Sequence, residues 1–471
     1  MSTPRPSGPD PKYAWSEITG KDLPKRSPEQ RLGDFHETHF PFDEATAQEQ
    51  ASRCVQCPRP GCVMSCPVDS PIQRWLELTA DGRFLEASKL VSDSTPVAEI
   101  CARLCPRDHL CEDACILNGP AEPVSIGAIE EFLAEYGIAH GEGVAVAPAN
   151  GWKVAVLGTG VAGLACASEL VRRGYAVTFI ARGERPGGFL IRGTSTLRID
   201  EAIVARRIAM LKEQGVAFRM GVVPGKDVSM AALQAEFDAI FVGLDFRRAR
   251  ALTVPGGELP GVVQGTEFVG HERGEALAGI PGVDVKGSRV VVLGEDDTAV
   301  DCARTALRRG AMQVVCVCPH SVGALACCRR EYDDAEEEGV QFRFEQAPVS
   351  LSPDSASGQV ARIRLAGTRR TDAGGWEVIP GEVQEMEADW VILALGAEPE
   401  PHLFEGDFGA LEAGRGGSVT VDANQMTSIP GVFAGGDAVR GPCEVVVAIR
   451  DARLAVEGIE RYLMERKKTS R

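Results

Sequence analysis

The stretch "KVAVLGTGVAGLACASELVRRGYAVTFIAR", residues 153–182, decides the fold. Its apolar residues 154–157 predict a strand, and the periodic segment that follows predicts a helix leading into a second strand. Gly158, Gly160 and Gly163 form a G-x-G-x-x-G turn between the first strand and the helix. This motif inside a strand–turn–helix–strand unit predicts a Rossmann-like dinucleotide-binding domain, because the helix N-terminus offers free N–H groups to a diphosphate.

A second unit of the same design is "RVVVLGEDDTAVDCARTALRRG", residues 289–310. Gly294, Asp296 and Ala299 stand where the first unit has its three glycines, and Glu295 adds another acid to the turn. Two such units predict an α/β chain with two dinucleotide-binding domains. A carboxylate about 5 Å from a phosphate costs roughly 3 kcal/mol at an effective dielectric near 20, about 100-fold in affinity. We therefore expect impaired or lost dinucleotide binding at the second unit.

Eight of the 15 cysteines lie in two runs, "CVQCPRPGCVMSC" at 54–66 and "CARLCPRDHLCEDAC" at 101–115. The cysteines are spaced x2, x4, x3 in the first run and x3, x5, x3 in the second. Thiolates at such spacings are typical of iron–sulfur clusters. The alternative is a pair of four-cysteine zinc sites, although zinc ribbons favour C-x2-C knuckles and only one occurs here. Helical periodicity around both runs predicts a helical domain held by clusters.

Composition narrows the choice of partners and compartment. The 471 residues allow two to four domains, and the net charge of −17 argues against nucleic acid and anionic membranes as partners. No apolar run reaches the roughly 18 residues of a membrane span, and the N-terminus does not have the apolar core of a signal peptide. We expect a cytoplasmic protein with no membrane insertion, in which reduced thiols serve metals rather than disulfides.

A third motif, "GVFAGGDAVRG" at 431–441, predicts a strand, a turn at Gly436 and Asp437, and a helix. An aspartate at such a turn can hold a ribityl hydroxyl of FAD while the helix N-terminus meets its diphosphate.

These motifs together resemble one family. The eight-cysteine pattern, "GTGVAGLA", "RPGG", "AEEEGV" and "GVFAGGDAVRG" resemble the glutamate synthase small (beta) chain, the large chain of NADH-dependent ferredoxin:NADP oxidoreductase and the N-terminal half of dihydropyrimidine dehydrogenase. The resemblance covers roughly residues 27–465. It implies a helical two-cluster iron–sulfur domain at 1–145, an FAD domain at 151–280 and 389–471, and an NAD(P)H-type domain inserted at 281–388.

The resemblance also implies the cofactor ligands. One [4Fe–4S] cluster would be held by Cys54, Cys57, Cys62 and Cys115, and the other by Cys66, Cys105, Cys111 and Glu130. Cys101 would be a neighbour, although spacing alone does not choose between Glu130 and Cys101. FAD would be held by Gly158, Gly160, Gly163, Gly187, Gly188, Gly436 and Asp437.

The chain departs from the family at its second turn. Relatives that use NADPH carry two arginines after the next strand, where this chain has Pro319 and His320. We therefore expect an oxidoreductase subunit that transfers electrons through FAD and two clusters in a larger complex, without direct NAD(P)H use. Two alternatives remain open at this point: a working NAD(P)H-dependent flavin dehydrogenase that feeds a partner, and a mainly structural subunit. No catalytic residue stands out.

Overall fold

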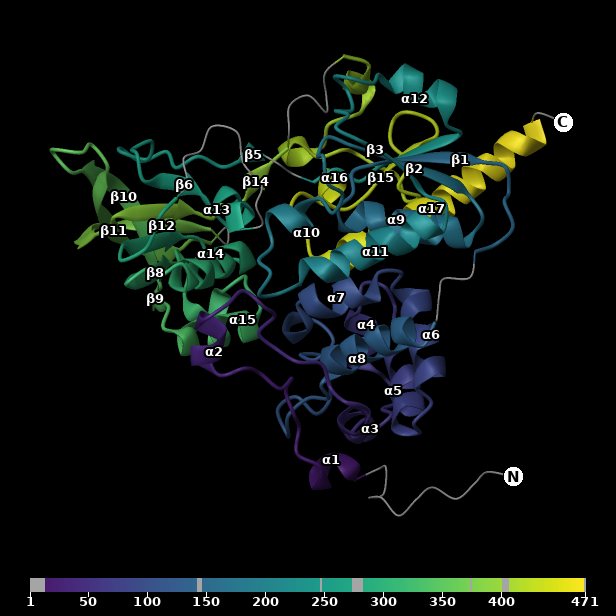
Figure 1. Cartoon of the computed structure of the whole chain (residues 1–471), viewed down its shortest axis with the longest axis horizontal. Coiled ribbons are helices and arrows are strands. Elements are labelled where there is room, and N and C mark those ends of the chain that lie inside the picture. The colour runs from purple at the N-terminus through teal and green to yellow at the C-terminus, as the bar shows by residue number, and fades with distance from the viewer. Residues whose placement is uncertain are drawn as a thin grey trace.

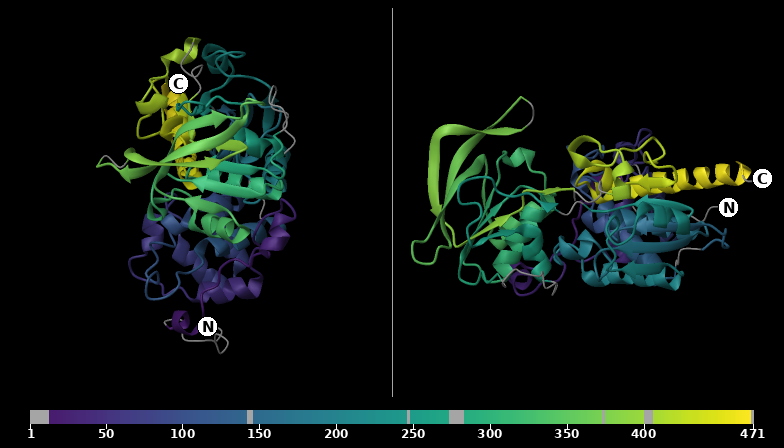
Figure 2. Two further views of the ribbon diagram at one scale, coloured as in Figure 1. Left: turned by 90° about the vertical axis from the view of Figure 1, so that its left-hand side faces the viewer. Right: turned by 90° about the horizontal axis from the view of Figure 1, so that it is seen from above.

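The structure is a computed structural model that describes residues 13–141, 146–245, 248–272, 283–372, 375–399 and 406–469. A helical domain formed by the N-terminal residues lies below two α/β units that stand side by side (Figures 1 and 2). Its helices are α1 (Ala14–Glu17), α2 (Pro28–Leu32), α3 (Glu44–Ser52), α4 (Gly61–Ser65), α5 (Ile72–Ala80), α6 (Phe84–Ser94), α7 (Ala98–Leu104) and α8 (Ile126–Ala139). No helix in these ranges is both long enough and apolar enough to span a bilayer.

The first α/β unit, called the first frame here, is built on a parallel five-stranded sheet of order β15-β4-β1-β2-β3. Its strands are β1 (Lys153–Leu157), β2 (Ala176–Ala181), β3 (Ala217–Met220), β4 (Ala239–Val242) and β15 (Val432–Ala434). Its helices are α9 (Val161–Arg172), α10 (Phe189–Arg192), α11 (Glu201–Glu213), α12 (Met230–Glu236), α16 (Asp437–Arg440) and α17 (Val445–Thr469). β15 comes from far along the chain, so the sheet is completed after the second unit.

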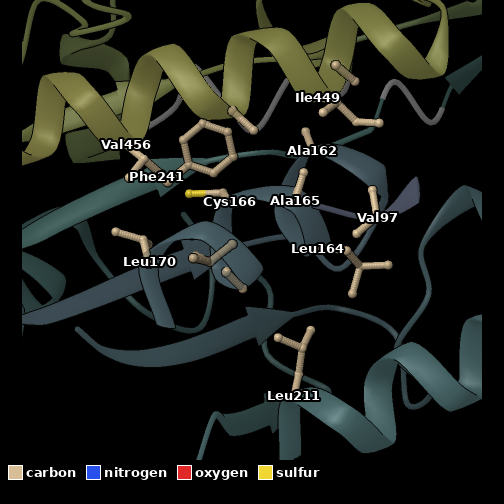
Figure 3. Close-up of a cluster of buried hydrophobic side chains, with 14 of the residues drawn as sticks. Val97, Ala162, Leu164, Ala165, Cys166, Leu170, Leu211, Phe241, Ile449 and Val456 are labelled. Carbon is tan, nitrogen blue, oxygen red and sulfur yellow. The ribbon is translucent and has the colours of Figure 1, made fainter. Parts of the chain in front are cut away.

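A single apolar core joins the first frame to the helical domain. Ala162 of α9 lies beside Ile449 of α17, and Leu164 lies on the other side of α9, near Val97, which precedes α7; all four belong to the same cluster (Figure 3). None of these four side chains is more than 7% exposed. Burial of this kind stabilises by roughly 25 cal/mol per Å² of apolar area, so the helical domain is fixed against the first frame.

The second α/β unit, called the second frame here, has a parallel sheet of order β6-β13-β7-β8-β9. Its strands are β6 (Val262–Gln264), β7 (Arg289–Leu293), β8 (Gln313–Val317), β9 (Gln341–Arg343) and β13 (Trp390–Leu393), and its helices are α13 (Gly265–Glu272), α14 (Asp297–Arg308) and α15 (Arg329–Glu338). An antiparallel sheet of β10 (Gln346–Pro353), β11 (Val360–Arg370) and β12 (Trp376–Glu387) covers it, and β5 (Arg248–Ala249) pairs with β14 (Ala397–Glu398) between the frames.

The predicted limits of this unit are too narrow. β6 and β13 lie outside 281–388 and yet are strands of its sheet, with β13 paired to both β6 and β7. The chain therefore enters the second frame before residue 281 and leaves it after residue 388. The predicted fold class, a helical iron–sulfur domain followed by two Rossmann-like units, is confirmed.

Buried ion pairs tie the second frame to the N-terminal segment. Arg31 of α2, 1% exposed, contacts Asp334 at 3.1 Å. Arg304 of α14, fully buried, binds Glu338 at 2.7 Å and donates to the hydroxyl of Thr38 at 2.6 Å. The segment before the clusters thus holds α14 and α15, which carry the second turn and its neighbours.

Candidate functional site

The first four predicted cluster ligands lie around one small cavity. Cys54, Cys57, Cys62 and Cys115 line it together, although they come from two separate runs. The amide of Gln73 donates to the carbonyl of Cys57 at 2.7 Å and lies 3.7 Å from its sulfur. Burial raises the pKa of Cys54 to about 11 and that of Cys62 to about 12. These thiols therefore stay protonated at neutral pH until a metal displaces the protons.

A close backbone approach brings the two cysteine runs together. A Cβ atom at Gly61 would lie 2.3 Å from the carbonyl oxygen of Ala114, so only glycine fits beside the second run. Gly61 directly precedes Cys62, and Ala114 directly precedes Cys115. The contact accounts for the pairing of the first run with the last cysteine of the second run.

The other predicted ligands also gather in one place. The pKa of Cys66 is raised to about 11, chiefly by burial and also by the charges of Glu130 and Cys105. Burial chiefly raises the pKa of Cys111 as well, with contributions from Cys105, Glu130 and Cys66. Burial raises the pKa of the Glu130 carboxyl to about 7. Cys101 lies against Cys105, so the structure places both candidate fourth ligands at this site.

The thiols of the two cysteine runs form two separate groups. Among the described residues, no group of three or more histidine, cysteine, aspartate or glutamate side chains is placed to hold a single metal ion. A four-iron cube spreads its thiolates around a larger volume than one zinc ion does, and two separate groups of thiols are present.

The first turn is left open by its glycines. Gly158 has φ of +99°, and a Cβ atom there would lie 2.4 Å from the carbonyl oxygen of Gly243. A Cβ atom at Gly163 would lie 2.2 Å from the carbonyl oxygen of Gly158, so helix α9 packs directly on the turn. The backbone thus reaches the geometry that exposes the first N–H groups of α9.

The "RPGG" loop folds over this turn. The N–H of Gly187 donates to the hydroxyl of Thr159 at 3.1 Å. Gly188 has φ of +58°, and a Cβ atom there would meet Cα of Gly160 at 2.6 Å. The structure thus brings Gly158, Gly160, Gly163, Gly187 and Gly188 into one cradle.

Asp437 is the first residue of α16, which begins next to α9. Gly436, with φ of +64°, packs closely against Ala162. A Cβ atom added at Gly436 would lie 2.9 Å from the Ala162 side chain. Asp437 accepts a hydrogen bond from the N–H of Cys443 at 3.2 Å. The predicted ribityl anchor therefore faces the same region as the glycine cradle.

Sequence reasoning missed Asp245. Its carboxylate accepts from the N–H of Phe189 at 3.1 Å and lies over Gly160, where a Cβ atom would be 2.4 Å from Oδ1. The only signal was its position directly after Gly243 and Leu244, at the end of β4. At that end of a parallel strand, side chains point toward the ligand crevice.

A cavity of about 450 Å³ lies where the three parts of the molecule meet. The helical domain contributes residues on either side of Cys105, and both α/β frames contribute carboxylates. Its lining includes Leu104, Pro106, Val161, Ala162, Phe189, Arg198, Gly243, Asp245, Asp297, Asp301, Asp437 and Val445. The volume falls in the usual range of cofactor pockets. Asp437 and the N-terminus of α9 border it, so it suits the redox end of a flavin.

The second turn is closed by its own acids. Asp296 is the N-cap of α14, where its carboxylate accepts from the N–H of Ala299 at 3.1 Å. Glu295 pairs with His320 at 2.7 Å, across the ends of β7 and β8. Asp297 binds Arg198 at 3.0 Å. Burial raises the pKa of Asp296 to about 6, so its carboxylate is mostly charged at neutral pH.

Comparisons with known proteins agree with the two-part organisation. The family described as dihydropyrimidine dehydrogenase domain II, 4Fe-4S cluster, matches residues 31–142. The family described as pyridine nucleotide-disulphide oxidoreductase matches residues 152–452. Among solved structures, Mycobacterium tuberculosis FprA in complex with NADPH aligns with a TM-score of 0.59 at 19% identity, over 69% of this chain and 86% of that chain. This likeness concerns the fold alone.

Sequence relatives cover nearly the whole chain. The glutamate synthase [NADPH] small chain of Azospirillum brasilense is 37% identical over 459 residues, which is 94% of this chain and 95% of the relative. The corresponding small chain of Escherichia coli (strain K12) is 34% identical over 475 residues, 96% of this chain and 98% of the relative. The chain therefore belongs to the glutamate synthase small chain family, among the iron–sulfur flavoproteins of the pyridine nucleotide-disulphide oxidoreductase type.

Proposed function

We propose that this oxidoreductase is a cytoplasmic electron-transfer subunit that holds FAD and two [4Fe–4S] clusters and has lost direct NAD(P)H use. The observation that carries the proposal is the second turn, where Asp296 caps α14 with its own carboxylate. A phosphate bound there would have to displace this carboxylate from the N–H of Ala299. Glu295 and His320 are paired at the strand ends that border the same turn.

The contrast with the first turn supports the proposal. In the first frame three glycines leave the N-terminus of α9 without a side-chain cap. In the second frame the equivalent N-terminus is capped, and Pro319 and His320 stand where the family resemblance implies arginines in relatives that use NADPH. Of these two turns, only the one before α9 keeps its helix N-terminus free of a side-chain cap, although the Asp245 carboxylate lies over Gly160, and this favours one dinucleotide cofactor, FAD, over two.

The ligand sets that we propose are those implied by the family resemblance, and the contacts described above support them. We assign one cluster to Cys54, Cys57, Cys62 and Cys115, and the other to Cys66, Cys105, Cys111 and Glu130. We assign the FAD diphosphate to Gly158, Gly160, Gly163, Gly187 and Gly188, and its ribityl chain to Gly436 and Asp437. When bound, the clusters pass single electrons and the flavin exchanges electron pairs. Leu104 and Pro106, which flank Cys105, line the flavin cavity, so the second cluster would be the one nearest the flavin.

A protein partner follows from the same reasoning. If no nucleotide reduces the flavin, electrons must enter or leave through another protein. The relatives are small chains of glutamate synthase, a name that implies a larger chain beside them. We propose a partner subunit of this kind, with the first cluster at the contact.

One observation favours a second function. The relatives are named as NADPH-dependent glutamate synthase chains, at 34–37% identity over nearly their full length. Under this alternative the chain oxidises NADPH and feeds the electrons to the partner. The capped second turn must then open when the nucleotide binds.

Stopped-flow mixing separates the two functions. Anaerobically purified protein, loaded with iron and FAD, is mixed with NADH or NADPH, and flavin absorbance is followed from milliseconds to minutes. We expect no rapid bleaching with either nucleotide, while dithionite reduces both clusters and flavin in the same sample. Bleaching within milliseconds at micromolar NADH or NADPH would establish the alternative function.

A further inference from the structure

A buried carboxyl group on α14 lines the flavin cavity without a full set of partners. Asp301 is 1% exposed and borders the cavity. Its Oδ2 accepts from the N–H of Ser195 at 3.0 Å. Its Oδ1 is buried and has no hydrogen-bond donor within the described part of the chain. A buried acceptor left unsatisfied is costly, so such a group needs an explanation.

The charged groups around Asp301 come from three elements. Arg198, in the loop before α11, lies 4.0 Å from its Oδ2 and binds Asp297 at 3.0 Å. Glu331 of α15 lies 3.8 Å from the Nε of Arg198. Glu331 is also bound by Arg304 at 2.6 Å, so Arg198 is shared mainly between Asp297 and Asp301. Burial and the two neighbouring carboxylates favour uptake of a proton at Asp301.

The proposed electron route makes a proton donor necessary. Conversion of FAD to FADH2 takes two electrons and two protons. A nicotinamide delivers both electrons and one of the protons together as hydride. Reduced [4Fe–4S] clusters deliver only electrons, one from each cluster, so both protons must come from the protein or from water.

We propose that Asp301 donates a proton to the flavin when the clusters reduce it, and that Asp297 resupplies this proton from solvent. The proposal rests on the function proposed above. For each flavin reduced, two clusters are oxidised by one electron each and two protons enter from solvent, one of them through Asp301. In the reverse direction Asp301 accepts the proton.

The geometry of α14 provides the path. Asp297 and Asp301 are four residues apart, so their side chains lie one above the other on the same helix face. The Asp297 side chain is 30% exposed and Asp301 is 1% exposed. Both line the cavity and both face Arg198. A proton taken up at the outer carboxylate can thus move one helical turn inward.

The titration range of Asp301 suits this role. Burial raises its pKa to about 7, against the opposing effect of Arg198. Half of the molecules then hold the proton near neutral pH, where a general acid works best. Because the donor is the protonated form, the rate of cluster-driven flavin reduction should fall as the pH rises through about 7.

The test compares Asp301→Asn, Asp301→Glu and a control, Asp354→Asn, in an exposed turn between β10 and β11. Each holoprotein is reduced with photogenerated electrons through the clusters, in H2O and D2O, between pH 6 and 9. Infrared difference spectra of flavin reduction give a second readout, the carbonyl band of the protonated carboxyl group. We expect Asp301→Asn to slow flavin reduction by roughly 100-fold and to abolish both its pH dependence and its isotope effect.

Rescue distinguishes proton transfer from structural damage. Formate, a small acid, should restore much of the rate in Asp301→Asn, while Asp301→Glu keeps the pH profile and Asp354→Asn behaves as wild type. The infrared carboxyl band should vanish in Asp301→Asn alone. A wild-type rate and pH profile in Asp301→Asn would overturn the proposal. So would a slowed variant that keeps its isotope effect and ignores formate.

The same samples separate this inference from the function on which it rests. If NADH or NADPH bleaches the wild-type flavin rapidly, the proposal that the protein has lost direct NAD(P)H use is wrong. The photoreduction series still decides the role of Asp301. Protein that keeps its iron but binds no FAD overturns both.

Discussion

Replacing both acids of the second turn by glycine should restore a dinucleotide site. In Glu295→Gly/Asp296→Gly the cap on Ala299 is removed, and the turn then has glycine at both positions that match Gly158 and Gly160 of the first frame. We expect NADH and NADPH to bind the variant at least 100-fold more tightly than the wild type.

The structure attributes most of the gain to Asp296. A carboxylate about 5 Å from a phosphate opposes it by roughly 3 kcal/mol at an effective dielectric near 20, about 100-fold in affinity. Glu295 is already held by a hydrogen bond to His320 at 2.7 Å, so its removal adds less. Asp296→Gly alone should therefore give nearly the whole effect.

Stability and pH supply an independent check on Asp296. Its folded-state pKa is raised from 3.8 to about 6, so the folded protein gains stability below pH 4 and loses that gain as the pH rises through 6. At pH 7 the buried Asp296 carboxylate therefore costs about 3 kcal/mol of stability. Replacing it by glycine costs less, a few tenths of a kcal/mol for the weaker cap and about 1 kcal/mol for the greater backbone freedom of glycine. Asp296→Gly should be no less stable than wild type at pH 7. Nucleotide affinity of the wild type should rise as the pH falls below 6.

Calorimetric titration of the holoprotein with each nucleotide measures the affinities, and thermal unfolding measures the stability. Glu295→Gln/Asp296→Asn is the matched control, because it removes the charges and keeps the shape, and asparagine still caps a helix. It should gain only the electrostatic part. If the glycine variant folds and binds neither nucleotide better than wild type, the acids are not what closes this site and our reasoning is wrong.

Three further outcomes are expected. Cys54→Ala and Cys115→Ala should each remove the same half of the iron, measured by iron analysis and electron paramagnetic resonance. Gly160→Ala should abolish FAD binding, because its Cβ would fill the cradle, whereas Gly323→Ala, which meets nothing within 4 Å, should retain it by flavin fluorescence after denaturation. Arg304→Ala should cost about 3–5 kcal/mol in denaturant unfolding, because it removes the buried guanidinium that binds Glu331 at 2.6 Å and Glu338 at 2.7 Å.

Local signals in the sequence predicted the two frames. The strand order and the limits of the second frame depend on non-local strand pairing, so the sequence did not predict them. The glycine turn, its strand and its helix are contiguous, so "VAVLGTGVAGLA" predicts β1 and α9 directly. The sheet of the second frame takes β6 and β13 from outside the predicted limits, because strand order depends on crossovers that no local pattern records.

In the candidate site, too, some features could be predicted from local sequence signals and others depend on contacts between distant segments. Cys54 and Cys115 were grouped through the family resemblance, and the structure places them around one cavity. Asp296 was expected to repel phosphate, and the structure adds that it caps α14, a role that its place three residues before Ala299 could have predicted. The contact of Arg198 with Asp297 and Asp301 joins distant segments, so it could not be read from the sequence.

The differences between the N-termini of α14 and α9 follow from one physical constraint. A helix N-terminus has few free N–H groups, so a side-chain carboxylate and a bound phosphate compete for the same donors. In the first frame Gly160 leaves those donors to a cofactor, and in the second frame Asp296 takes one of them. If the chain has given up its nucleotide in this way, as we propose, it has also given up the proton that hydride carries. One turn further along α14, Asp301 faces the flavin cavity with a carboxyl group that can supply a proton in its place.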